Sequence, residues 1–115
     1  MTARSNDGSA DLSQLRKGVL ELAVLALLRR RPHYGGELAE ALADSEGLAA
    51  SAGTLYPLLT RLRTAGWVDT SWQESPSGPP RKYYTLTRAG RQQLARLERS
   101  WATLVRSVDE LLEER

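Results

Sequence analysis

The sequence predicts a mainly α-helical fold with one small β-hairpin. Three observations support this prediction. Apolar residues recur every three or four positions in segments before residue 66, a Pro/Gly/Ser-rich turn separates two β-favouring stretches between residues 67 and 86, and the helical spacing returns from residue 87 onward. A chain of 115 residues with 41% hydrophobic residues is the size of one small domain.

The first predicted helix begins near Leu12, where Asp11 or Ser13 can cap it, and runs without interruption to the residue before Arg31. Its second half is apolar nearly all round, so we expect that half to be buried on several sides. Pro32 disfavours a helical conformation at the preceding residue and should end the helix.

A second helix of two or three turns should follow a turn at residues 34–36, with Leu38 and Leu42 facing inward. Residues 45–50 then form a connection to the third helix.

The start of the third helix is ambiguous between Ser51 and Thr54, because Pro57 fits best in a first turn. A cap at Ser51 with a distorted opening turn is the preferred interpretation. Gly66 should end the helix, since glycine adopts the left-handed conformation at a helix end without steric cost. The predicted buried stripe is Leu55, Leu58, Leu59 and Leu62, and the opposite, short, polar and basic face holds Thr54, Tyr56, Pro57, Thr60, Arg61 and Thr64.

Two strands should follow, over residues 67–72 and 82–86, joined by a proline-rich turn. Because side chains alternate between the two faces of a strand, one of Tyr83 and Tyr84 is predicted to lie in the core.

Thr87 is predicted to cap the last helix, which continues to the end of the chain. At ~1.5 Å per residue this helix would be about 40 Å long, more than so small a body can cover. Its apolar stripe therefore needs a partner, and a second copy of the chain is the expected one. The predicted dimer interface is Leu97, Trp101, Leu104, Val108 and Leu111.

The chain divides into a small polar segment over residues 1–10, expected to be a disordered arm, a domain over residues 11–86, and the dimerisation helix over residues 87–115. The most apolar stretch, Val19 to Leu28, is too short to cross a bilayer, and the N-terminus lacks the apolar segment of a signal peptide. We expect a cytoplasmic protein that makes no contact with a membrane.

The sequence offers no candidate for catalysis or for a cofactor. It has no cysteine, and His33 is its one histidine, so a metal site or an acid–base site lacks converging partners. An enzyme is therefore not expected. Positive charge gathers in residues 51–91, which hold six Lys and Arg against two acids, although the whole chain has a net charge of +2.

Two segments, TLYPLLTRLRTAGWVD at Thr54–Asp69 and GPPRKYYTLTRAGRQQL at Gly78–Leu94, resemble the PadR family of bacterial transcriptional regulators. LRKGVLELAVLALL at Leu15–Leu28 adds support, and the resemblance covers residues 12–112. It implies a winged helix-turn-helix followed by a long dimerisation helix, as in the short subfamily. Gly36 departs from the family, in which an aromatic residue is usual at that position.

The resemblance implies a sequence-specific, homodimeric repressor that inserts its third helix into the major groove of a pseudo-palindromic DNA operator. Arg81 and Lys82 at the wing are phosphate candidates, and Trp101 is the candidate contact for a small hydrophobic effector. Arg16 and Lys17 lie in a first helix that flanks the DNA in folds of this kind, but a solvated helix end is the preferred explanation for them. By match to the family motif, the groove residues would be Ser51, Gly53, Thr54, Tyr56 and Arg61.

A protein-interaction module built on the same winged fold is the alternative function. An uncharged or acidic face on the third helix would indicate it, and here that face carries Arg61.

Overall fold

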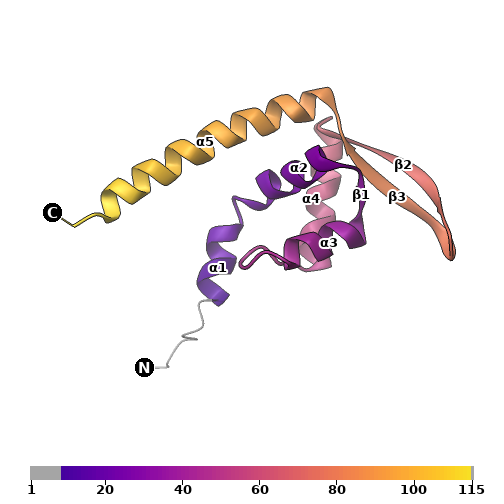
Figure 1. The fold of residues 1–115 in the computed structure, drawn as a ribbon, viewed down its shortest axis with the longest axis horizontal. Coiled ribbons are helices and arrows are strands. Elements are labelled where there is room, and N and C mark those ends of the chain that lie inside the picture. The colour runs from indigo at the N-terminus through magenta and orange to yellow at the C-terminus, as the bar shows by residue number, and fades with distance from the viewer. Residues whose placement is uncertain (1–8, 115) are drawn as a thin grey trace.

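The computed structural model describes residues 9–114 and confirms the predicted fold class. Three helices, α2, α3 and α4, cluster together, a β-hairpin projects to one side of them, and α5 extends past them in the opposite direction (Figure 1). The elements are α1 (Ser9–Arg16), α2 (Leu20–Arg30), β1 (His33–Tyr34), α3 (Gly35–Ala43), α4 (Ala52–Thr64), β2 (Val68–Ser75), β3 (Gly78–Leu86) and α5 (Arg88–Leu112).

The predicted single first helix is wrong, because the structure divides it into α1 and α2. The chain turns at residues 17–19, where the Val19 N–H donates to the Arg16 carbonyl at 2.8 Å. Gly18 in this turn is a poor helix former, at about 1 kcal/mol less favourable than alanine. α1 already includes Ser9, and residues 1–8 of the expected arm lie outside the described residues.

The predicted turn at residues 34–36 is also wrong. His33 and Tyr34 form β1, which pairs antiparallel with β3 through His33↔Tyr84 and Tyr34↔Tyr83, and α3 begins directly at Gly35. The wing is therefore part of a three-stranded sheet in the order β1-β3-β2. A two-residue strand shows no alternation in sequence, so no pattern could have predicted it.

The helix boundaries around α4 are confirmed. Ser51 is the N-cap with extended backbone, and Gly66, which follows the C-cap residue Ala65, has φ of +83°. α2 ends at Arg30 and Arg31 is extended, as the following proline requires.

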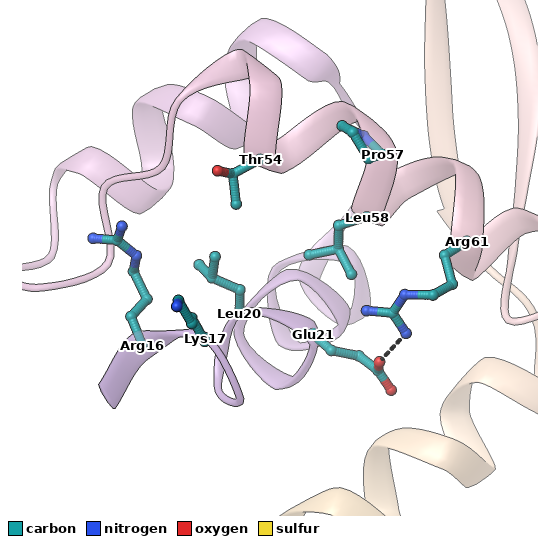
Figure 2. Close-up of a pocket in the computed structure, with 8 residues that line it drawn as sticks. All are labelled: Arg16, Lys17, Leu20, Glu21, Thr54, Pro57, Leu58 and Arg61. Carbon is teal, nitrogen blue, oxygen red and sulfur yellow. Dashed lines mark hydrogen bonds and ion pairs between the residues drawn. The ribbon is translucent and has the colours of Figure 1, made fainter. Parts of the chain in front are cut away.

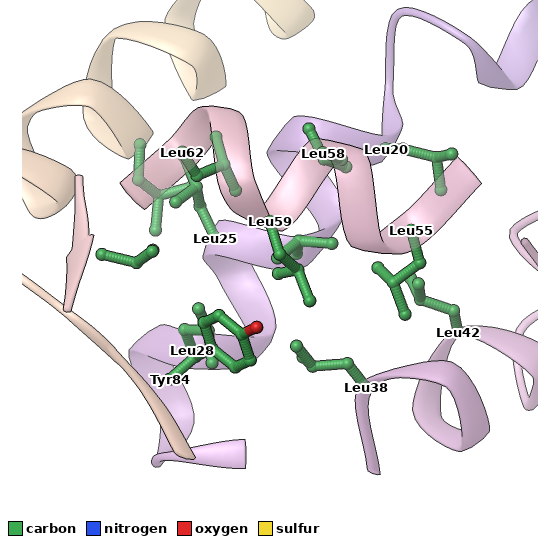
Figure 3. Close-up of a cluster of buried hydrophobic side chains, with 13 residues drawn as sticks. Leu20, Leu25, Leu28, Leu38, Leu42, Leu55, Leu58, Leu59, Leu62 and Tyr84 are labelled. Carbon is green, nitrogen blue, oxygen red and sulfur yellow. The ribbon is translucent and has the colours of Figure 1, made fainter. Parts of the chain in front are cut away.

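The core lies between α2, α3, α4 and the sheet (Figure 3). The predicted stripe of α4 is buried, and Leu59 and Leu62 have no exposed surface. Tyr84 is the wing tyrosine that enters this core, whereas Tyr83 is only partly buried. The stripe fixes which side of α4 faces solvent, because the opposite residues have no other element to cover them.

The wing is longer and its turn tighter than predicted. β2 and β3 pair from Val68↔Leu86 to Ser75↔Gly78, with an irregularity between Gln73 and Ser75. Only residues 76 and 77 form the turn. Trp72 lies opposite Lys82 on the face of the hairpin that also carries Tyr84, since alternate residues share a face.

α5 begins at the predicted cap. The Gly90 N–H donates to Thr87 Oγ1 at 2.9 Å, and the same hydroxyl donates to the Gly66 carbonyl at 2.7 Å. The first part of α5 packs against α2, and Leu94 is buried there. The remainder of the helix extends beyond the domain (Figure 1).

Candidate nucleic-acid interface

The solvent-facing side of α4 carries small hydroxyl and backbone groups. Ser51, Gly53 and Thr54 are all exposed at its N-terminal end, and Ser51 Oγ lies 3.3 Å from Thr54 Oγ1. Thr60 is exposed one turn beyond Tyr56, and its hydroxyl donates to the Tyr56 carbonyl at 3.1 Å. Such a face can approach a nucleic-acid groove closely, because its side chains are short.

The Tyr56 side chain is partly packed against α3 and partly exposed to solvent. Its hydroxyl and the adjoining edge of its ring lie against Gly35, the first residue of α3, where a side chain on residue 35 would collide with them. The tyrosine is nevertheless 46% exposed. The close approach to Gly35 fixes the ring, so the exposed part of the side chain has a defined position.

Arg61 lies on the flank of α4 that faces α2. Its Nη1 is 2.8 Å from Glu21 Oε1, and Gln93 of α5 donates to the other carboxylate oxygen at 3.2 Å. The Glu21 side chain is 17% exposed, but that of Arg61 is 60% exposed. Glu21 therefore joins α2, α4 and α5, a role that the sequence did not reveal.

The opposite flank of α4 faces the wing and carries Arg63, which is not among the predicted groove residues. A shallow groove of about 200 Å³ runs between this flank and β3. The seven-residue spacing between Tyr56 and Arg63 was the available signal, because it places both on one side of a helix. The groove is lined by Leu59, Thr60, Arg63, Thr64, Lys82 and Tyr84.

Tyr84 forms the floor of this groove. Burial raises the pKa of its hydroxyl, and the neighbouring Tyr56 adds to the increase, while Arg63 partly offsets it. The hydroxyl therefore stays protonated near neutral pH.

The two predicted wing cations point to different faces of the hairpin. The Arg81 guanidinium lies 4.4 Å from the ring centre of Tyr34, which itself contacts Tyr83 edge-on. Lys82 Nζ lies 5.9 Å from the rings of both Trp72 and Tyr84. Lys82 thus belongs to the groove beside α4, and Arg81 belongs to the outer side of the wing.

A second hollow, of about 450 Å³, lies between α4 and the junction of α1 with α2 (Figure 2). The sequence did not predict this hollow, because the hollow depends on the turn between α1 and α2 and the sequence predicted one continuous helix there. The lining residues are Arg16, Lys17, Leu20, Glu21, Thr54, Pro57, Leu58 and Arg61.

The predicted dimer residues form an uncovered stripe on α5. Leu97 packs partly against the core, but Trp101, Leu104 and Val108 are 46%, 60% and 48% exposed. Leu111 is 84% exposed at the end of the stripe. Trp101, Leu104, Val105, Val108 and Asp109 surround an almost wholly apolar hollow of about 210 Å³.

His33 has a structural place in the fold. It is 4% exposed, and its Nδ1 lies 2.8 Å from the Arg31 carbonyl, to which that nitrogen donates. Within residues 9–114 no group of three His, Asp or Glu side chains is arranged to hold a metal ion. No helix in the same range combines the length and apolar character needed to cross a bilayer.

Comparisons with known proteins identify the family. Residues 24–96 match the PadR-like family of transcriptional regulators. A PadR family transcriptional regulator from Eggerthella lenta has a similar structure, with 40% identity, 93% coverage of both chains and a TM-score of 0.82. A PadR-like transcription factor from Bacteroides fragilis is 43% identical, over 86% of this chain and 95% of that one, with a TM-score of 0.72.

A PadR-like transcriptional regulator from Bacillus cereus is 35% identical over 90% of this chain and all of its own length, with a TM-score of 0.81. The family match covers more than half of the chain, and two structures that share at least 40% identity cover 93% and 86% of it. The chain therefore belongs to the PadR-like family of transcriptional regulators, which are DNA-binding regulators and not enzymes.

Proposed function

We propose that the chain is a cytoplasmic repressor that binds a pseudo-palindromic DNA operator as a homodimer. The observation that carries this proposal is the exposed face of α4. Its apolar stripe is buried, its outer face is short and polar, and Arg63 and Lys82 lie along one flank. A helix of this kind fits the major groove, which is about 12 Å wide.

The predicted contacts take separate roles in this proposal. The hydroxyls of Ser51, Thr54 and Tyr56 donate hydrogen bonds to phosphate oxygens or base edges, and Gly53 lets the backbone approach the DNA. Arg61 stays in the proposed set because its guanidinium remains largely exposed beside Glu21. The wing cations Arg81 and Lys82 contact the phosphate backbone, with Lys82 supported by its position beside α4.

The dimer is proposed from the uncovered stripe on α5. Apolar surface of this extent on a projecting helix is unfavourable in water, and a second copy offers the matching stripe. Two wings would then face half-sites about 34 Å apart, or a multiple of that distance. A flat hydrophobic effector would enter beside Trp101 and relieve repression by changing the distance between the wings.

The proposal is tested by measuring binding to genomic fragments at fixed salt concentration, comparing Tyr56→Phe with the wild type. Phenylalanine keeps the ring edge against Gly35 but removes the hydroxyl, which is the Tyr56 atom nearest that glycine, so an unchanged unfolding temperature is the control for the fold. We expect a loss of about 1 kcal/mol in binding free energy if the hydroxyl contacts DNA.

A Tyr56→Phe variant with wild-type affinity would remove Tyr56 from the interface. A wild-type dimer that binds none of the fragments at low ionic strength would overturn the DNA-binding proposal and favour a protein-interaction module instead.

A further inference from the structure

The hollow between α4 and the α1–α2 junction lies on the side of α4 away from the wing. The wing-side groove is lined by Thr60, Arg63 and Thr64, whereas the junction hollow is lined by Thr54, Pro57 and Arg61. At about 100° per residue, these two sets lie on opposite flanks of the exposed face of the helix. α4 is therefore bordered by a basic groove on each side.

The charges in the junction hollow are unevenly matched. Glu21, the acid among the lining residues, is already paired with Arg61 and accepts from Gln93. Lys17 therefore adds positive charge that Glu21 does not balance, and Arg16 lines the hollow beside it. Figure 2 shows both side chains on the part of the hollow nearest Thr54, with the Glu21–Arg61 pair at the other end.

The break in the first helix creates this arrangement. α1 ends at Arg16, and the turn through Lys17 and Gly18 brings the basic pair next to the first turn of α4. Among the described residues, no heavy atom outside the local chain lies within 4 Å of the position where a Gly18 side chain would begin. Within this part of the chain, no other element covers that side of the turn.

A helix in the major groove has a phosphate backbone on each side, because the groove is only slightly wider than the helix with its side chains. The wing supplies cations toward one backbone through Lys82. The hollow beside Arg16 and Lys17 lies along the other flank of α4.

We propose that the α1–α2 junction is a second phosphate site, in which Lys17, Arg16 and the Thr54 hydroxyl bind a phosphodiester group of the DNA strand opposite the one contacted by the wing. This inference rests on the proposed DNA-binding function and extends it to a segment that the sequence placed at a solvated helix end.

The test measures how the affinity of the full-length protein for double-stranded DNA depends on salt concentration. The probe is a fluorescent mixed-sequence duplex long enough for two half-sites, titrated at several chloride concentrations. A cation that neutralises one phosphate adds about 0.9 to the slope of log K against log [salt], so Lys17→Gln should reduce the slope by about 0.9 per protomer. The matched control is Arg30→Gln, which removes one exposed charge from the far end of α2.

The expected result is a smaller slope for Lys17→Gln and a wild-type slope for Arg30→Gln. Equal slopes for Lys17→Gln and the wild type would overturn the second site while leaving the DNA-binding proposal intact. A wild-type protein that fails to bind the duplex at low salt would instead overturn the proposed function itself.

A competition experiment distinguishes whether the hollow binds a phosphate group of the DNA backbone or free inorganic phosphate. Millimolar inorganic phosphate, added at matched ionic strength, should leave wild-type DNA affinity unchanged. A loss of affinity that Lys17→Gln abolishes would show that free phosphate competes with DNA for the hollow. Lys17-dependent binding of phosphate without DNA, together with an unchanged salt slope for Lys17→Gln, would overturn the assignment to DNA.

Discussion

Helices α4 and α5 have apolar stripes of similar spacing but opposite environments. In α4, Leu55 is 1% exposed and Leu59 is fully buried, whereas in α5 Leu104 is 60% and Leu111 is 84% exposed. The α4 stripe is covered by α2, α3 and the sheet (Figure 3). The α5 stripe extends past those elements (Figure 1). The same sequence pattern thus stabilises the fold in one helix and leaves an exposed apolar surface, the proposed dimer interface, in the other.

The largest expected effect comes from placing a charge in the uncovered stripe. Leu104→Asp should dissociate the proposed dimer while the monomer stays folded, because residue 104 makes no contribution to the core. Each buried leucine contributes about 1.5–3 kcal/mol, and a symmetric dimer loses two, so the expected cost is roughly 3–6 kcal/mol. Sedimentation velocity measures the change in mass.

The control for this variant is Ala102→Asp, which places the same charge on a different side of the same helix. It should sediment as the wild type does. A Leu104→Asp protein that also sediments as a dimer would show that the stripe is not the interface.

A smaller effect is expected from the covered stripe. Leu59→Ala leaves a cavity in a fully buried site, so the free energy of unfolding should fall by about 2–5 kcal/mol. Urea denaturation at fixed protein concentration measures this change. A loss below about 1 kcal/mol would contradict the packing of α4 described above.

The smallest effect concerns the start of α3, which positions Gly35 against Tyr56. Glu37 accepts the Tyr34 N–H at 3.2 Å, and its carboxylate lies 3.4 Å from Arg31 Nη1. Partial burial acts to raise the pKa of Glu37, but these hydrogen bonds and the charge of Arg31 lower it more, and the net pKa is below its ordinary value. The ionised form is therefore favoured in the folded protein.

Glu37→Ala should cost about 0.5–1.5 kcal/mol in the free energy of unfolding at neutral pH. A lowered folded-state pKa gives stability that is present above the unfolded-state pKa of about 4.3 and is lost as the pH falls through the folded-state value. The difference between wild type and variant should therefore narrow below about pH 4. Thermal unfolding across this range checks it, and a difference independent of pH would exclude an ionised Glu37 as the cause.

Much of the fold could be predicted because its signals are local. Pro32, Gly66 and Thr87 each act on the backbone within a few residues, and all three mark an element boundary in the structure. The α4 stripe was equally clear, since four leucines at helical spacing need a core.

The wrong predictions concern elements that depend on contacts distant in the sequence or on a residue compatible with more than one structure. β1 exists because Tyr34 lies beside Tyr83, 49 residues later in the chain, and α1 separates from α2 at a glycine that a continuous helix can also tolerate. Arg61 and Arg63 have different environments, because Arg61 pairs with Glu21 and Arg63 lines the groove beside the wing. Helical spacing gives the side of a helix but not which element covers that side.

The junction between the wing and α5 connects the hairpin rigidly to the helix that carries the exposed apolar stripe. The Thr87 N–H donates to the Trp67 carbonyl at 3.1 Å, and Gly90 lies so close to that carbonyl that a side chain there would collide with it. The base of the hairpin and the first turn of α5 are consequently one stiff unit. Added or deleted residues beyond Leu97 would rotate the apolar stripe by about 100° each and leave the hairpin in place. Changes before Leu94 would instead change the direction of the hairpin, so the proposed pairing of subunits and the proposed contact of the wing with DNA can be altered through separate parts of a single helix.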